Sequence, residues 1–72
     1  MKTIKINGEY LELGKLLKIA NVISSGGEAK YYLQENNVLV NGEVENRRGK
    51  KLYPGDVVKI ENEEYTIKWS IA

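Results

Sequence analysis

The spacing of apolar residues changes along the chain, and each change predicts a different element. Near the amino terminus, Thr3–Ile6 and Tyr10–Leu11 are short strand candidates on either side of an Asn7-Gly8 turn. The next apolar residues follow the i, i+3, i+4, i+7 spacing of one helix face: Leu13, Leu16, Leu17 and Ala20. A short helix is therefore predicted there, followed by a turn over residues 21–24.

A second helix is predicted from Ser25 to about Glu35. Ser25-Gly26-Gly27-Glu28 is typical of a helix start, in which the Ser25 side chain accepts from the N–H of residue 28. Glu28 would reach back to the N–H of Ser25. The expected buried face is Ala29, Tyr32 and Leu33. Asn36-Asn37 predicts a left-handed stop.

The rest of the chain has a strand pattern. Val38–Val40, an Asn41-Gly42 turn and Glu43–Glu45 predict a hairpin, because Asn-Gly is the strongest short-range hairpin signal. Tyr53-Pro54-Gly55-Asp56 predicts a turn before a strand at Val57–Ile60. A turn at Asn62-Glu63 leads into Glu64–Trp69, where alternate residues share one face: Tyr65, Ile67 and Trp69. This order predicts an α+β fold with two short helices and a small antiparallel sheet.

The composition limits the chemistry. With 72 residues the chain has room for one domain, and it contains no Cys and no His. Disulfides, zinc ribbons, Cys nucleophiles and Ser-His-Asp triads are therefore excluded, and we expect neither an enzyme nor a metal or cofactor site. The longest uncharged stretch, Ile19–Gly27, is too short to span a membrane, and Met1–Lys5 does not resemble a signal peptide. These features predict a cytoplasmic location.

The charges are unevenly distributed. The net charge is +1, but residues 15–51 hold seven basic and four acidic residues, a net +3. Residues 52–72 hold two basic and four acidic residues, a net −2. Four of the basic residues fall in the run Arg47-Arg48-Gly49-Lys50-Lys51. Such a run suits phosphate contacts, and the alternative is a solvated loop.

Two further features have a functional and a structural interpretation. Ser24-Ser25-Gly26-Gly27 combines exposed N–H groups with small side chains, so it can bind a phosphate or serve as an ordinary helix cap. Tyr31 and Tyr53 are not assigned to a periodic face, so they can either stack on a base or pack against the protein.

Four segments together resemble the S-four RNA-binding domain, which is named for ribosomal small-subunit protein four and is also called the αL motif. They are Leu13–Lys18, Ser24–Lys30, Val38–Glu43 and Leu52–Val58, in which Val-Asn-Gly and Pro-Gly-Asp-Val-Val are the most specific parts. The similarity covers about residues 10–61, with a terminal hairpin reaching residue 69. The segments at residues 25–27 and 46–52 further resemble short stand-alone bacterial members.

The resemblance implies a single domain with two helices packed on a small bent sheet, and RNA binding across the helices and the following hairpin. It places Lys15 and Lys18 on the first helix, and Ser25, Gly26 and Lys30 at the start of the second. With the glycine-rich helix start and the basic run included, the candidate RNA-binding residues are Lys15, Lys18, Ser25, Gly26, Gly27, Lys30, Asn41, Gly42, Arg47, Arg48, Lys50 and Lys51.

Our first functional hypothesis is a monomeric module that binds structured rRNA or tRNA, and thereby the ribosome, through backbone and shape contacts. The chain departs from the family pattern at two places. Many members open the first helix with Arg-Leu-Asp, which is Glu12-Leu13-Gly14 here, and many carry Ser-Arg where this chain has Ser25-Gly26. The missing cations and the acidic terminal hairpin support an alternative hypothesis, a protein-interaction adaptor with weakened RNA affinity.

Overall fold

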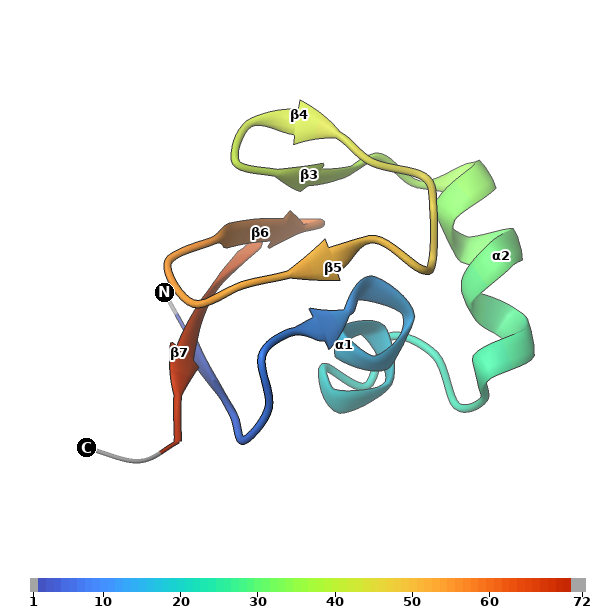
Figure 1. Cartoon of the computed structure of the whole chain (residues 1–72). Coiled ribbons are helices and arrows are strands. Elements are labelled where there is room, and N and C mark those ends of the chain that lie inside the picture. Colours follow the sequence, from blue (N-terminus) through green and yellow to red (C-terminus); the bar gives the residue numbers. More distant parts are fainter. Residues whose placement is uncertain (1, 71–72) are drawn as a thin grey trace.

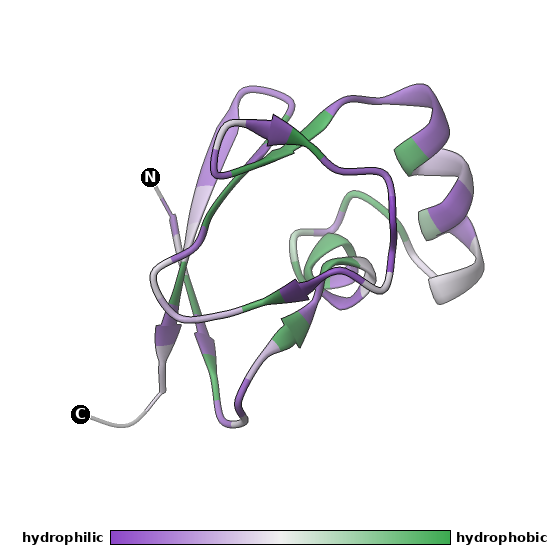
Figure 2. Cartoon of the chain, turned by 45° about the horizontal axis from the view of Figure 1, so that its top comes forward, coloured by the Kyte–Doolittle hydropathy of each residue, from purple (hydrophilic) through white to green (hydrophobic). Residues whose placement is uncertain are grey.

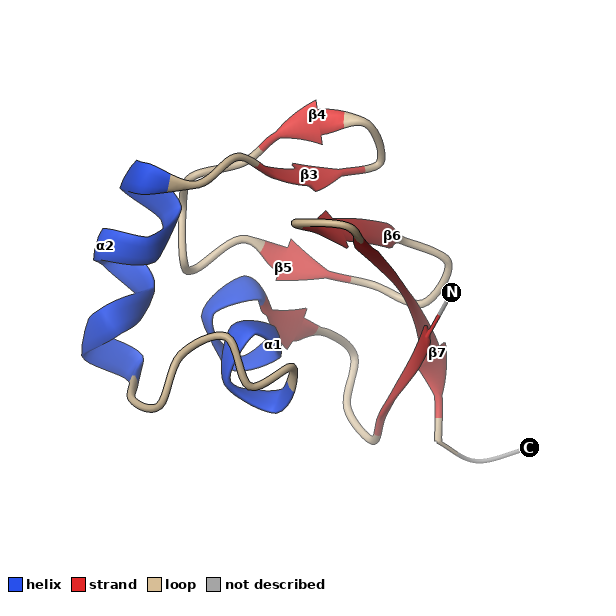
Figure 3. Ribbon diagram, turned by 180° about the vertical axis from the view of Figure 1, so that it is seen from behind, coloured by secondary structure: helices blue, strands red, loops and turns tan. Residues whose placement is uncertain are grey.

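Two helices and seven strands make up residues 2–70, the part of the chain that the computed structural model describes (Figure 1). The helices are α1 (Leu13–Ile19) and α2 (Gly26–Glu35). The strands are β1 (Lys2–Ile6), β2 (Leu11–Glu12), β3 (Val38–Val40), β4 (Glu43–Val44), β5 (Lys51–Leu52), β6 (Val57–Ile60) and β7 (Glu63–Trp69). The α+β prediction is confirmed. From behind, both helices lie on one side of the molecule and the strand ends near the termini lie on the other (Figure 3).

The strands form two sheets. The larger sheet has the order β1-β7-β6-β3-β4, and all of its neighbours are antiparallel except β1 and β7, which run parallel. The smaller sheet is an antiparallel pair of β2 and β5. Strand β5 was missed in the sequence because two residues are too few to show a period of two.

The two amino-terminal strands, both predicted from the sequence, do not pair with each other across Asn7-Gly8. β1 instead pairs with β7 from Lys2↔Tyr65 to Ile6↔Trp69, and Leu11 of β2 pairs with Leu52 of β5. A hairpin between β1 and the two-residue β2 would give few ladder bonds, whereas β7 is long enough to pair with all five residues of β1.

Helix α1 is followed by a turn, as predicted, whereas α2 ends differently from the prediction. The left-handed residue follows α1 at Asn21, where φ is 64°, and its N–H bonds to the carbonyl of Lys18 at 3.0 Å. Asn36 after α2 is extended, with φ −128°, so the predicted left-handed stop at Asn36-Asn37 is wrong. The Asn36 side chain caps the helix instead, donating from Nδ2 to the carbonyl of Tyr32 at 3.1 Å.

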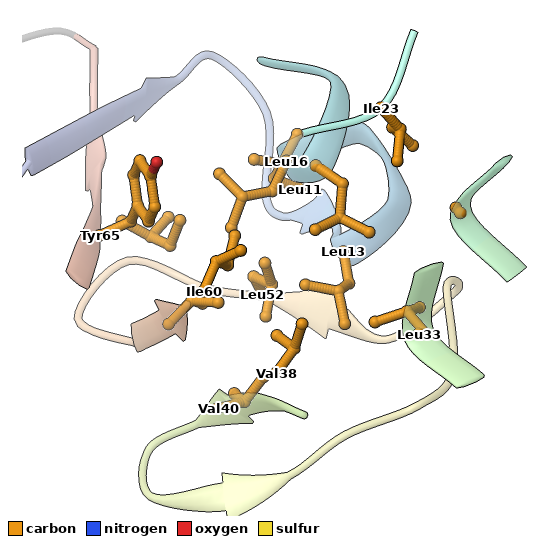
Figure 4. Packing of buried hydrophobic residues seen from close by; sticks show 14 of the residues in the cluster. Leu11, Leu13, Leu16, Ile23, Leu33, Val38, Val40, Leu52, Ile60 and Tyr65 are labelled. Atoms are coloured by element: carbon orange, nitrogen blue, oxygen red, sulfur yellow. The ribbon is translucent and has the colours of Figure 1, made fainter. Parts of the chain in front are cut away.

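The core lies between the large sheet and the helices. Leu52 is fully buried between α1 and the strands that carry Val38 and Ile60 (Figure 4). Helix α1 contributes Leu13, Leu16 and Leu17, and α2 contributes Ala29 and Leu33. The predicted burial of Tyr65 and Ile67 is confirmed, but Trp69 is 50% exposed because it lies at the end of β7 beyond the core.

Three turns hold the sheet together. Asn41 and Gly42 have φ values of 52° and 87°, as the Asn-Gly signal predicted, and Gly55 has φ 100° in the Pro-Gly turn. The turn between β6 and β7 lies one residue earlier than predicted, at Glu61-Asn62, and Glu61 has φ 57°.

Tyr32 joins α2 to that last turn. Its side chain is partly buried, and its hydroxyl donates to Glu61 Oε2 at 3.0 Å. Burial, and then the bond to the Glu61 carboxylate, raise the pKa of Tyr32 to about 12. The ring therefore stays neutral and ties the helix layer to the sheet.

Candidate nucleic-acid interface

The basic segment, residues 47–51, is held against the start of α1. The N–H of Leu13 bonds to the carbonyl of Lys50 at 2.9 Å, and the N–H of Gly14 bonds to the carbonyl of Arg48 at 2.8 Å. The first N–H groups of a helix have no carbonyl partner within the helix. Here two carbonyl groups of the basic segment accept from the first two N–H groups of α1. In Figures 1 and 2 the hydrophilic stretch that joins β4 to β5 runs past the helices. Its cations therefore start from an anchored backbone.

Gly14 allows this close approach. A Cβ at this position would lie 3.3 Å from the carbonyl oxygen of Arg48, 3.5 Å from its Cβ and 3.7 Å from the Cβ of Ala29. A larger side chain would push the basic segment away from α1. In the sequence this residue appears only as a departure from the family pattern, because the contact joins positions 34 residues apart.

The basic segment separates two grooves. The helix groove lies on the side of the two helices and is lined by Glu12, Gly14, Lys15, Lys18, Gly26, Arg48 and Gly49. Three predicted cations meet here, namely Lys15, Lys18 and Arg48, and Glu12 is the acidic residue among them. Neither lysine nor Arg48 has an ion-pair partner among residues 2–70, so all three charges are available to an anionic ligand.

The hairpin groove lies on the other side of the basic segment. It consists of two adjoining hollows that share four residues: Arg47, Lys50, Lys51 and Tyr53. The β3–β4 hairpin forms the opposite wall with Asn41, Glu43, Val44 and Glu45. The run of four cations, continuous in the sequence, is thus divided between two surfaces.

Arg47 differs from the other cations because it is paired. Its Nε donates to Glu45 Oε2 at 2.9 Å and its backbone N–H to the same oxygen at 3.1 Å. The guanidinium lowers the pKa of Glu45, and the carboxylate raises the pKa of Arg47. Since the pair is intramolecular, Arg47 offers less net charge to a ligand than Arg48 does.

The start of α2 already holds an internal carboxylate. Glu28 Oε1 accepts from the N–H of Ser24 at 3.2 Å, from the Ser24 hydroxyl, and from the Ser25 hydroxyl at 3.5 Å. These bonds, above all that from the Ser24 hydroxyl, lower the pKa of Glu28. The predicted helix start after Ser25 is confirmed, but the predicted capping box is wrong: the Ser25 side chain caps no N–H of the helix, and Glu28 is held mainly by Ser24.

The two glycines at the start of α2, Gly26 and Gly27, differ in their access to a ligand. Gly26 lines the helix groove, and a Cβ there would meet nothing within 4 Å, so the backbone is open to a ligand. Ser25 and Gly27 are exposed beside the Glu28 carboxylate. A phosphate at the start of α2 would be repelled by the Glu28 carboxylate. A phosphate beside Lys15 and Lys18 of α1 would be attracted by both lysines.

The remaining predicted residues lie apart. Lys30 is exposed on α2 and Gly42 is exposed in the hairpin turn, and neither lines the two grooves. Asn41 lines the hairpin groove, but its amide is engaged. Nδ2 donates to Asp56 Oδ1 at 3.1 Å, and Oδ1 accepts from the N–H of Val57 at 2.9 Å. Asn41 therefore joins the hairpin turn to β6.

An aromatic pair stands at the edge of the hairpin groove. The Tyr10 and Tyr53 ring centroids are 6.1 Å apart with the rings tilted by 54°. Lys51 Nζ lies 4.9 Å from the centroid of Tyr10, within the range of a cation–π contact. Both rings are substantially exposed. The sequence indicated Tyr53 as unconstrained, but it gave no sign that Tyr10 would be its neighbour.

Comparison with known proteins identifies the family. The sequence matches the model of the S4 domain over residues 4–68, nearly all of the chain. The chain belongs to the S4 domain family. The resemblance found in the Val-Asn-Gly and Pro-Gly-Asp-Val-Val segments is thereby confirmed.

One similar protein is the probable ribosome maturation protein RlbA of Bacillus subtilis (strain 168). It is 60% identical to this S4 domain over 58 residues, which cover 81% of this chain and 82% of that protein. Within residues 2–70, no helix is long and apolar enough to cross a membrane.

Proposed function

We propose that this S4 domain binds structured ribosomal RNA through its phosphate backbone, with the helix groove as the main contact. The observation that carries the proposal is the convergence of Lys15, Lys18 and Arg48 on one groove, where none of them has an ion-pair partner among residues 2–70. A rigid groove lined by cations suits the shape and backbone of an A-form helix. The name of the Bacillus relative supports ribosomal RNA over transfer RNA as the ligand.

The two customary helix cations that this chain lacks are replaced from another part of the fold. Glu12 and Gly26 stand where many family members carry arginine, and Arg48 of the basic segment lines the same groove as both. Because Gly14 brings the Arg48 backbone within 2.8 Å of α1, the guanidinium starts close to the missing positions. Arg48 is therefore the arginine on which this S4 domain relies.

The test is a titration of fragments of ribosomal RNA at several salt concentrations. The two grooves together hold six cations, of which Arg47 is paired with Glu45. If these cations contact phosphates, the logarithm of the association constant should fall with the logarithm of the salt concentration with a slope of about −4 to −5. A variant with Lys15, Lys18 and Arg48 all changed to Ala should reduce the magnitude of the slope by about 2 to 3.

The matched control removes the same charge elsewhere. Lys5, Lys59 and Lys68 are exposed on β1, β6 and β7 and line neither groove. Their triple Ala variant should keep the slope within about 1 of the wild type. Equal losses in the two triple variants would mean that only overall charge matters, and would refute a groove-centred site.

The adaptor hypothesis is distinguished by a second measurement. Protein partners that remain bound after nuclease treatment, and after the Lys15/Lys18/Arg48 substitution, would favour an adaptor. Loss of all partners on nuclease treatment would count against it.

A further inference from the structure

We propose that the hairpin groove holds one unpaired base of the RNA, stacked on the ring of Tyr53. This inference rests on the proposed function and names the class of RNA: a helix interrupted by an unpaired nucleotide, such as a bulge or a junction. It is carried by the exposed ring of Tyr53, which lines the hairpin groove together with Arg47, Lys50 and Lys51 and packs at the edge of that groove against Tyr10.

Tyr53 is exposed without contributing to the core. Its side chain is 48% exposed, and it is absent from the buried cluster and from the hydrophobic residues packed against that cluster. Its backbone is nevertheless held, since its N–H donates to Asp56 Oδ2 at 2.8 Å and its carbonyl accepts from the N–H of Asp56 at 3.0 Å. A ring presented from an anchored turn can stack on a base with little loss of conformational entropy.

Tyr10 supports the ring from the side. With centroids 6.1 Å apart and a tilt of 54°, the two rings touch obliquely, so part of the Tyr53 face stays open. The Lys51 ammonium lies over Tyr10 and thus beside the pair. An aromatic platform with an adjacent cation is the arrangement that accepts a base and the phosphate next to it.

The two walls of the hairpin groove carry opposite charges, which suit the phosphate and the base edge of a nucleotide. Lys50 and Lys51 line the wall formed by the basic segment and have no ion-pair partner within residues 2–70. On the opposite wall, the Glu45 carboxylate is held by Arg47, whereas the Glu43 carboxylate has no hydrogen-bond or ion-pair partner among residues 2–70. A carboxylate repels phosphate but accepts from the N–H donors of a base edge. The phosphate is therefore expected on the lysine side and the base edge toward the hairpin.

The experiment compares two RNA hairpins that differ by one nucleotide. One carries a single unpaired 2-aminopurine in its stem, and the other has a fully paired stem of the same sequence. Affinities for both are measured by titration with the full chain, and 2-aminopurine fluorescence is recorded for the first. The variants are Tyr53→Leu, which keeps an apolar side chain against Tyr10, and Tyr53→Phe, which keeps the ring. Tyr31→Leu is the control, because Tyr31 is 67% exposed on α2 and lines neither groove.

The wild type should bind the RNA with the unpaired nucleotide about fivefold or more tightly than the paired RNA. Tyr53→Leu should lose that preference and the fluorescence change while binding the paired RNA normally, and Tyr53→Phe and Tyr31→Leu should keep both. Equal affinity of the wild type for the two RNAs, or an equal loss on both in Tyr53→Leu, would overturn the stacking site. In that case a salt-dependent affinity that still needs Lys15, Lys18 and Arg48 would leave the proposed function intact. Absence of any salt-dependent RNA binding would refute both.

Discussion

Asn41 was a candidate RNA-binding residue, and the structure predicts a different role that substitution can measure. Its amide makes two hydrogen bonds, to Asp56 Oδ1 and from the N–H of Val57, and its φ of 52° lies in the left-handed region. Asn41→Gly removes both bonds and keeps the backbone unstrained. Asn41→Ala removes the same bonds and adds a strained backbone.

The magnitudes follow from these two effects. Each hydrogen bond contributes about 0.5–1 kcal/mol at an exposed turn, so Asn41→Gly should lower the free energy of unfolding by about 1–2 kcal/mol. A left-handed alanine costs roughly 1–2 kcal/mol, offset by about 0.4–1 kcal/mol from the lower entropy of its unfolded chain. Asn41→Ala should therefore be less stable than Asn41→Gly by about 0.5–1 kcal/mol.

The assay is urea unfolding followed by circular dichroism, with RNA affinity measured where each variant is fully folded. Asn46→Ala is the control, because Asn46 is exposed and has no hydrogen-bond partner within residues 2–70, so its effect should stay within about 0.5 kcal/mol. RNA affinity of Asn41→Gly should match the wild type within about twofold. Wild-type stability together with a large loss of RNA affinity would refute the reasoning and make Asn41 a ligand.

Three further substitutions test other parts of the structure. Leu52→Ala should lower the free energy of unfolding by about 2–5 kcal/mol, because Leu52 is fully buried at the centre of the core; a loss below about 1 kcal/mol in urea unfolding would contradict this packing. Gly14→Val should destabilise by about 1–3 kcal/mol and lower RNA affinity, because the added side chain would displace the backbone that carries Arg48. Gly8→Val, at a position with open space, should leave affinity unchanged. The pKa of Glu28 is lowered in the folded state, so its bonds to Ser24 stabilise the fold above the ordinary value of 4.5 and are lost as the pH falls through the lowered value. Between about pH 5 and pH 3, thermal unfolding should show a smaller loss of stability in Glu28→Gln than in the wild type. The control variant Glu35→Gln should behave like the wild type. Identical pH profiles of all three proteins would exclude the Glu28 contact as a source of acid sensitivity.

The sequence by itself determined the local elements and the family. Apolar spacing predicted the first helix, and the start at Ser25-Gly26-Gly27-Glu28 predicted the second. Asn41-Gly42 and Pro54-Gly55 predicted two turns whose positive φ values the structure shows. These features depend on a few neighbouring residues, so a single sequence carries them. The same is true of the Val-Asn-Gly and Pro-Gly-Asp-Val-Val segments, which carry the resemblance to the S4 domain.

Only the tertiary structure decided which distant segments meet. β1 pairs with β7 and not across Asn7-Gly8, because strand pairing depends on the whole sheet and its core face. Gly14 receives Arg48, and Tyr10 meets Tyr53, through contacts between residues more than thirty positions apart. The run Arg47-Arg48-Gly49-Lys50-Lys51 is one feature in the sequence, but in the structure its cations line two different grooves. Arg48 lines the helix groove, and the hairpin groove is lined by Arg47, Lys50 and Lys51. Charge composition is local, but the surface on which a charge acts is set by the packing of the loop that carries it.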